Sequence, residues 1–233
     1  MKGNIYELVK ACIGDYDLIT PGDRVLMGLS GGKDSLTCLM VLEGLREELS
    51  FDLCACFVAY PMEEITKDIK LFLNKIGIKL YEILPQDVSE KLNCNRCAHI
   101  RRKTLLECAY SNGFNKVAIG HNYEDNAETA LLNLFTGQGV EKLSPKRVYF
   151  DKITLIRPLL YVREKKIISY VLRNNLPVCE NKCENLPNCG RIKIREILKE
   201  LSLRYPNIYE NILKLNNVNK REMVKEDEIN NQL

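Results

Sequence analysis

Residues 29–35, which read LSGGKDS, combine glycines, hydroxyls and a lysine in the pattern of a loop that binds phosphate. Two successive glycines let a backbone turn sharply, so that its N–H groups converge on an anion. The hydroxyls of Ser30 and Ser35 and the ammonium group of Lys33 add donors and positive charge. An apolar run precedes the loop and a helical pattern follows it, so the first turn of that helix adds free N–H groups. The segment therefore predicts a cradle for a polyphosphate.

The loop differs from the two most familiar nucleotide-binding patterns. A Walker A loop needs glycine at position 27 and Ser or Thr directly after the lysine, where this chain has Met27 and Asp34. The G-x-G-x-x-G spacing of dinucleotide-binding folds is also absent. The alternative interpretation is a plain glycine turn capped by Asp34.

Five of the ten cysteines lie among polar and turn-forming residues, where burial in a core does not account for them. They are Cys94 and Cys97, which form a C-x-x-C, and Cys179, Cys183 and Cys189. Three interpretations are open: structural zinc held by four thiolates, an iron–sulfur cluster held by three cysteines with one iron open, or a redox pair. The remaining cysteines occupy apolar stretches and are predicted to be small core residues. They are Cys12, Cys38, Cys54, Cys56 and Cys108.

Composition sets the class of protein. The chain has 233 residues, of which 45% are hydrophobic and 28% charged, as expected for one large globular domain, with or without a short appendage. No apolar run reaches the length of a membrane span, and residues 1–20 lack the zones of a signal peptide. We therefore expect a cytoplasmic protein without membrane association. Structural disulfides are rare in that reducing compartment, so the thiol groups indicate metal or reactive chemistry.

The net charge is only +3, but basic residues gather in three places. Such clusters can hold a polyanion such as RNA even when the whole chain is nearly neutral, and ordinary solvated surface is the alternative for each. The clusters are Arg96 with Arg101, Arg102 and Lys103, then Lys142 with Lys146, Arg147 and Lys152, and then Arg163 with Lys165 and Lys166.

Strand and helix patterns alternate along the chain. The predicted strands cover 24–29, 51–59, 78–84, 116–119 and 153–156. The predicted helices cover 34–49, 62–76, 100–111, 125–135, 164–173 and 192–215, and the C-x-x-C is expected in a polar linker. This alternation predicts an α/β fold with a parallel sheet covered by helices on both faces. We expect an N-terminal helical segment over 1–20, a nucleotide domain with the cysteine loops over 21–190, and a helical tail over 191–233 whose end is disordered.

The segment SGGKDS resembles the SGGxDS signature of the PP-loop ATP pyrophosphatases, and GHNYED at 120–125, followed by NAET, resembles their second block. The resemblance implies a Rossmann-like fold of the adenine nucleotide alpha hydrolase type. It also implies that ATP is split between its α and β phosphates while a substrate oxygen is adenylated. Asp125 would hold Mg²⁺ or orient the reacting groups, and Lys33 and Mg²⁺ would offset the charge of the leaving pyrophosphate.

The same resemblance implies an ATP site, with the backbone near Phe57 and Val58 against adenine. Its residues are Leu29, Ser30, Gly31, Gly32, Lys33, Asp34, Ser35, Phe57, Val58, Gly120, His121, Asn122 and Asp125. The catalytic residues among them are Lys33, Asp34 and Asp125, to which Arg101 is added. Arg101 lies four residues beyond Cys97 and would contact phosphate or stabilise the adenylate if a helix begins that early. RNA-backbone contact or surface charge is the alternative for Arg101.

The order of phosphate loop, C-x-x-C, GHNxxD block and late cysteine is similar to the tRNA 2-thiolation branch, especially the tRNA 2-thiocytidine synthetases. The sequence RPLLY at 157–161, leading to Arg163 and Glu164, matches as well. The resemblance implies a [4Fe–4S] cluster held by Cys94, Cys97 and Cys183, the last chosen because Pro187-Asn188 matches the Pro-Asn of the family. Cys179 and Cys189 are additional to the three cysteines of that pattern, so the choice of the third ligand stays open. Zinc remains the alternative to the cluster.

The resemblance implies tRNA as substrate, with a cysteine desulfurase or inorganic sulfide as sulfur donor and a possible homodimer. A tRNA thiouridine synthetase and a tRNA lysidine synthetase-like ligase are the alternative enzymes. A zinc-stabilised RNA-binding module is the alternative from another class, but it leaves the phosphate loop unexplained.

Overall fold

The computed structural model describes residues 4–59, 64–85, 94–179 and 190–215. They divide into two compact units: Met1–Glu124 with Ser144–Cys189, and Asp125–Leu143 with Gly190–Leu233. The first unit holds the sheet and the phosphate loop. The domain boundaries expected from the sequence stay a prediction.

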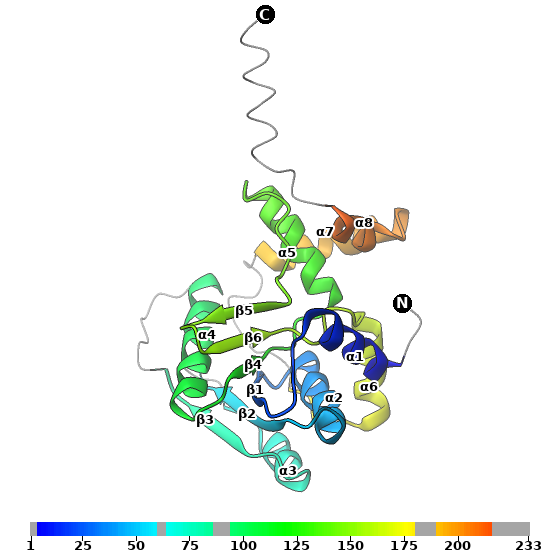
Figure 1. Ribbon diagram of the computed structural model, residues 1–233. Coiled ribbons are helices and arrows are strands. Elements are labelled where there is room, and N and C mark those ends of the chain that lie inside the picture. The colour runs from blue at the N-terminus through cyan, green and yellow to red at the C-terminus, as the bar shows by residue number, and fades with distance from the viewer. Residues whose placement is uncertain (1–3, 60–63, 86–93, 180–189, 216–233) are drawn as a thin grey trace, which may run out of the picture. The chain divides into compact units, whose positions relative to one another are not determined.

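A six-stranded sheet in the order β3-β2-β1-β4-β6-β5 forms the centre of the first unit (Figure 1). Its strands are β1 (Arg24–Leu29), β2 (Asp52–Val58), β3 (Leu80–Ile83), β4 (Lys116–Ala118), β5 (Lys146–Tyr149) and β6 (Ile153–Ile156). All neighbours pair in parallel except β5 and β6. The α/β fold with a mainly parallel sheet is therefore confirmed. The chain runs from β1 outward to β3 and then returns to β4 on the other side of β1. A topological switch point therefore lies between β1 and β4.

Strand β5 is the part of the sheet that the sequence did not predict. It pairs antiparallel with β6 because only residues 150–152 connect the two strands, far too few for a parallel crossover. Three of its four residues are exposed, so it lacks the apolar run by which the other strands were recognised.

Helices cover both faces of the sheet (Figure 1). In the first unit they are α1 (Ile5–Tyr16), α2 (Lys33–Leu49), α3 (Lys67–Lys75), α4 (Cys94–Ser111) and α6 (Glu164–Asn174). Helix α4 packs on one face, where Leu105, Leu106 and Ala109 meet Leu26 and Val117. Helix α2 packs on the opposite face with α1 and α6 beside it. Because both faces are covered, the central strand β1 is apolar without alternation, and Val25, Leu26 and Met27 are all fully buried.

Helix α4 corrects one expectation, because the C-x-x-C lies within its first turn and not in a polar linker. Residues 94–99 lack the apolar period that marks a packed helix, so the sequence predicted the helix only from residue 100. The condition for Arg101 to lie one turn beyond Cys97 is thereby met. The other predicted strands are present, as are the helices predicted over 34–49, 62–76, 125–135 and 164–173, although the second of these begins only at Lys67.

The second unit contains the part of α5 (Tyr123–Phe135) from Asp125 on, with α7 (Gly190–Arg204) and α8 (Ile208–Lys214). Pro206 separates α7 from α8, because its ring and missing N–H end a helix, so the predicted helical tail is two helices. The loop after α5 is fixed by Asn126, whose side-chain oxygen accepts a hydrogen bond from the N–H of Leu143 at 2.8 Å. In the part of the chain that the structure describes, no helix is both long and apolar enough to cross a membrane.

Candidate active site

The phosphate loop connects the carboxyl end of β1 to the first turn of α2, as its sequence predicts. Gly31 has φ +78°, a backbone conformation that side chains with a Cβ rarely adopt. The Ser35 hydroxyl donates to the carbonyl of Gly32 at 2.9 Å and lies 3.1 Å from the Ser30 hydroxyl. Gly32 is the N-cap of α2, and no side chain caps it, so the helix terminus keeps the character of an anion site.

Gly120 is held against the same loop by direct backbone packing. A Cβ atom added to Gly120 would lie 2.9 Å from the carbonyl carbon and oxygen of Asp34 and 3.0 Å from Cα of Ser35. Only glycine allows the segment after β4 to approach the first turn of α2 this closely. The backbone of Gly120, the first residue of the GHNYED block, is therefore packed directly against the helix that follows the phosphate loop.

Asn122 and Glu164 fix the two charged residues of the loop. The buried Asn122 amide donates to Oδ1 of Asp34 at 3.0 Å, while Lys33 Nζ lies 2.8 Å from Oδ2 of Asp34 and 2.9 Å from Oε1 of Glu164. Burial lowers the pKa of Lys33, but its hydrogen bonds to the two carboxylates outweigh that effect, so the pKa is raised. Lys33 is therefore a cation in this site.

Glu164 is a partner of Lys33 that the sequence does not predict. It begins α6, and its N–H donates to the Glu124 carboxylate at 2.8 Å, which itself lies 3.4 Å from Nε of Arg163. Acidic residues are common in first turns, so the sequence contains no signal that distinguishes this one.

His121 takes its orientation from Arg157, a residue 6% exposed that follows β6. Nε of Arg157 donates to Nδ1 of His121 at 3.1 Å, and its Nη1 donates to the carbonyl of Ser144. A guanidinium only donates hydrogen bonds, so Nδ1 of His121 is the unprotonated nitrogen and Nε2 carries the proton. The imidazole is thus neutral, with Nε2 as its donor.

Asp125 belongs to the second unit and is held there by an ion-pair cluster. Arg195 of α7 places Nε 2.7 Å from Oε1 of Glu128 and Nη2 3.3 Å from Oδ1 of Asp125. Glu128 is 1% exposed. Burial raises the pKa of Glu128, and the hydrogen bond from Arg195 opposes that rise. Sequence reasoning missed Arg195, because 70 residues separate it from Asp125.

The adenine side of the expected site lies at the end of β2. Phe57 is the register partner of Leu29, the last residue of β1, and both Phe57 and Val58 are buried. Their backbone therefore lies at the carboxyl ends of the strands, beside the phosphate loop. Their contact with adenine stays a prediction.

Cys179, the first of the late cysteines, lies against the phosphate loop. The N–H of Cys179 donates to the carbonyl of Gly31 at 2.9 Å, and a Cβ added to Gly31 would lie 3.3 Å from Cβ of Cys179. Cys183 and Cys189 lie outside the described residues. Cys94 and Cys97 are three residues apart in α4, so the two positions share one face of that helix.

The cysteines expected in the core are free thiols. Of the five expected in the core, Cys12, Cys38, Cys56 and Cys108 are buried and Cys54 is partly exposed. Burial raises the pKa of Cys12 to about 12, so its thiol is inert. Among the side chains that the structure describes, no three His, Cys, Asp or Glu are arranged around a metal position. The predicted cluster ligands, one of them undescribed, stay a prediction.

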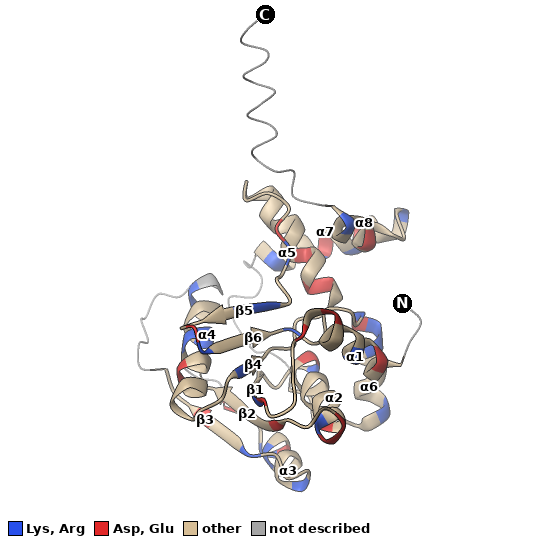
Figure 2. Cartoon of the chain, viewed as in Figure 1, with Lys and Arg blue, Asp and Glu red and all other residues tan. Residues whose placement is uncertain are grey.

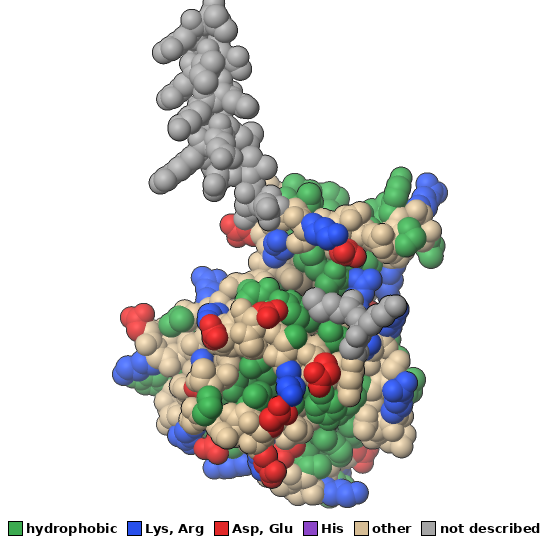
Figure 3. All heavy atoms as spheres, turned by 45° about the vertical axis from the view of Figure 1, so that its right-hand side comes forward, with side chains coloured by type: hydrophobic (Ala, Val, Ile, Leu, Met, Phe, Trp, Pro, Cys, Tyr) green, Lys and Arg blue, Asp and Glu red, His purple; other side chains and the backbone are tan. Residues whose placement is uncertain are grey.

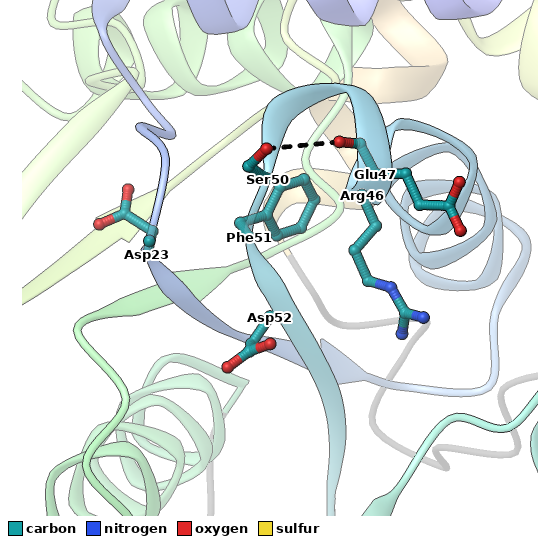
Figure 4. A pocket seen from close by; sticks show the side chains of 7 residues that line it. Asp23, Arg46, Glu47, Ser50, Phe51 and Asp52 are labelled. Carbon is teal, nitrogen blue, oxygen red and sulfur yellow. Dashed lines mark hydrogen bonds between the residues drawn. The ribbon is translucent and has the colours of Figure 1, made fainter.

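A hollow of about 270 Å³ at the opposite ends of the strands is a poor alternative site (Figure 4). It lies where β1 and β2 begin, and Asp23, Glu47 and Asp52 line it together with Arg46. The carboxylates of Asp23 and Asp52 would repel a polyphosphate. Asp23 is already used structurally, since it accepts a hydrogen bond from Asn115 at 2.7 Å.

The sheet, the loop after β1 and the glycine contact define an α/β nucleotide-binding protein with its site at the carboxyl ends of the strands. Residues 3–201 match the PP-loop domain family. The tRNA-cytidine(32) 2-sulfurtransferase of Histophilus somni is 34% identical over 85% of this chain and 67% of the relative. That of Coxiella burnetii is 33% identical over 96% of this chain and 93% of the relative. The chain therefore belongs to the PP-loop family, among relatives that carry this enzyme name.

A solved structure also resembles the protein through most of its length. It is the U34-tRNA thiolase NcsA from Methanococcus maripaludis with its [4Fe-4S] cluster, 25% identical, with a TM-score of 0.76. The likeness covers 90% of this chain and 76% of that one. The Rossmann-like fold expected from the sequence is thus confirmed.

Proposed function

We propose that the protein is an ATP-dependent tRNA sulfurtransferase that adenylates the C2 oxygen of a cytidine and replaces that oxygen with sulfur. The names of its curated relatives support tRNA as substrate and cytidine 32, in the anticodon loop, as target. The observation that carries the proposal is the hydrogen bond from the N–H of Cys179 to the carbonyl of Gly31, because it brings the first of the late cysteines to the loop that would bind ATP. A ligase that only adenylates its substrate has no use for thiols at that position.

The chain's own residues would first bind and activate ATP. The uncapped first turn of α2 and the protonated Lys33 would face the phosphates, and the triphosphate would replace Glu164 as the partner of Lys33. Nε2 of His121, oriented by Arg157, would donate a hydrogen bond to the nucleotide. Lys33 and the terminus of α2 would hold positive charge where the pyrophosphate leaves, and His121 would add a neutral donor, which together lower the barrier to adenylation.

The donor chemistry fits the two inorganic groups that the proposed reaction implies. Carboxylate oxygens are the ligands that Mg²⁺ prefers, and Asp125 offers one that Arg195 orients. Cys94 and Cys97 on one helix face, with Cys183 as the third thiol, match the thiolate ligation of a [4Fe–4S] cluster. When bound, such a cluster would supply an open iron position at which sulfur is brought to the activated carbon. Arg101, one turn from Cys97, would stabilise the adenylated intermediate.

We infer that the reaction takes place in the cytoplasm, where tRNA is found, with a cysteine desulfurase or inorganic sulfide as sulfur donor. A homodimer stays a prediction. The second candidate function is thiolation of a uridine, which the likeness to a U34-tRNA thiolase favours.

Nucleoside mass spectrometry of tRNA from a strain that lacks the gene tests the proposal. We expect 2-thiocytidine to disappear and to return when the gene is restored. Loss of 2-thiouridine instead would favour the second candidate, and unchanged thionucleosides would contradict both. Iron and labile sulfide in anaerobically purified protein would support the cluster, whereas zinc alone would exclude it.

A further inference from the structure

A stripe of exposed side chains runs along α4 from the C-x-x-C to the end of the helix. Arg96, His99, Lys103, Glu107 and Tyr110 are spaced three and four residues apart, so they lie on one face of the helix, and all five are exposed. Lys103 pairs with Glu107 at 3.7 Å. The first four, Glu107 included, line a hollow of about 200 Å³. The stripe presents mainly positive charge, and it begins one residue from Cys97.

The segment that forms β5 and its turn to β6 reads KRVYFDK, in which basic residues flank two adjacent aromatic residues and Asp151 lies between Phe150 and Lys152. Its turn places Phe150 and Asp151 at φ +54° and +52°, a conformation that favours Asn and Gly and disfavours a bulky aromatic residue. Phe150 is nevertheless 62% exposed and therefore makes little contribution to the core. A strained, exposed aromatic residue is suited to a contact outside the chain.

Helix α4 and the hairpin meet at a second hollow, of about 460 Å³, which Tyr110, Phe150 and Lys152 line with Glu107 and Ser111. Lys152 Nζ lies 5.5 Å from the centre of the Tyr110 ring, and the guanidinium of Arg147 lies 5.4 Å from that of Tyr149. A cation thus lies beside the Tyr110 ring at the hollow, and a second lies beside the Tyr149 ring in β5. Lys and Arg are visible on both β5 and α4 in Figure 2.

Two exposed rings beside several cations match the chemistry of single-stranded RNA, in which bases stack on aromatic residues and phosphates pair with Lys or Arg. The acidic residues here are Glu107, which is already paired with Lys103, and Asp151 in the hairpin turn. On the side of the molecule seen in Figure 3, by contrast, acidic and basic side chains are interspersed. A folded protein partner would favour an apolar contact surface over this arrangement.

We propose that the stripe on α4 and the β5–β6 hairpin form the docking surface for tRNA. Phe150 and Tyr110 stack on a nucleobase, while Arg96, Lys103 and Lys152 face backbone phosphates. This proposal rests on the proposed function, which makes tRNA the substrate. Because the stripe begins beside Cys97, RNA that lies along it leads toward the cysteine that would take part in sulfur transfer.

Phe150→Asn is the decisive variant, because it separates binding from folding. Asn suits the positive φ of residue 150, so we expect thermal stability to be unchanged or higher. Loss of one stacked base should nevertheless weaken tRNA binding about fivefold or more, measured by fluorescence anisotropy with labelled tRNA. Lys152→Ala should reduce the slope of log Kd against log salt concentration by about 0.7, the value for one phosphate contact.

Matched controls lie on α3, where Leu71 is 67% exposed and Lys75 is exposed. Leu71→Ala and Lys75→Ala should bind tRNA as the unaltered protein does, and all four variants should keep its affinity for ATP. If Phe150→Asn and Lys152→Ala bind tRNA like these controls, the docking surface is wrong while the proposed function stands. If the unaltered protein binds no tRNA, the proposed function fails as well. If the two variants lose only the binding of a protein sulfur donor, the surface serves a protein and the RNA proposal is overturned.

Discussion

Gly120→Ala tests the backbone contact between Gly120 and the first turn of α2. The added methyl group would lie 2.9 Å from the carbonyl carbon and oxygen of Asp34, so the two backbones must separate by about 0.5 Å to reach ordinary contact. Both neighbours are backbone atoms of the first turn of α2, which no change of rotamer can move. Overpacking of this kind destabilises a protein by about 1–3 kcal/mol. The displacement also falls on the helix terminus that would bind phosphate, so we expect pyrophosphate release to fall about tenfold or more.

Gly14→Ala is the matched control. Gly14 lies in α1, and a Cβ added there meets nothing within 4 Å. Alanine is the better helix former, so this control should gain about 0.5–1 kcal/mol of stability and keep its activity. Urea unfolding gives the free energies, and titration calorimetry gives the affinity for ATP. If Gly120→Ala matches Gly14→Ala in stability and in ATP affinity, the proposed backbone contact does not exist.

Three further substitutions test the second unit and the thiols. Arg195→Leu should destabilise the protein by about 3–5 kcal/mol, because it leaves the buried Glu128 carboxylate without its partner. Burial raises the pKa of Glu128 above its usual 4.5. In this variant the contribution of Glu128 to stability should therefore be full below pH 4.5 and be lost as the pH rises through the pKa of the folded state. Thermal unfolding from pH 4 to 8 would detect this loss. If the stability of the variant does not change over this pH range, the loss of stability does not come from the Glu128 carboxylate. Cys97→Ala should abolish thiolation but leave ATP binding intact, and an apoprotein with full sulfur transfer would refute the role of the cluster. Asp125→Ala should block pyrophosphate release without loss of iron, and persistent turnover would show that its assigned role is wrong.

Much of the fold follows from local patterns. The apolar run of β1 and the glycines after it identify strand, loop and helix within a dozen residues, because each depends on neighbours in the sequence. Strand β5 and the first turn of α4 escaped prediction for the same reason, since neither has a periodic apolar face. Strand β5 exists because β6 offers it a partner, and its register is set by that pairing.

The sequence by itself indicated a polyphosphate loop, a second block with Gly120 and Asp125, and cysteines that lie outside the apolar stretches. Only the tertiary structure decided which distant groups act on those residues. Glu164 holds Lys33, Arg157 orients His121, and Cys179 bonds to Gly31, across separations that no local pattern records. Such partners are set by how the strands order themselves and how closely backbones pack, and these are properties of the whole folded chain.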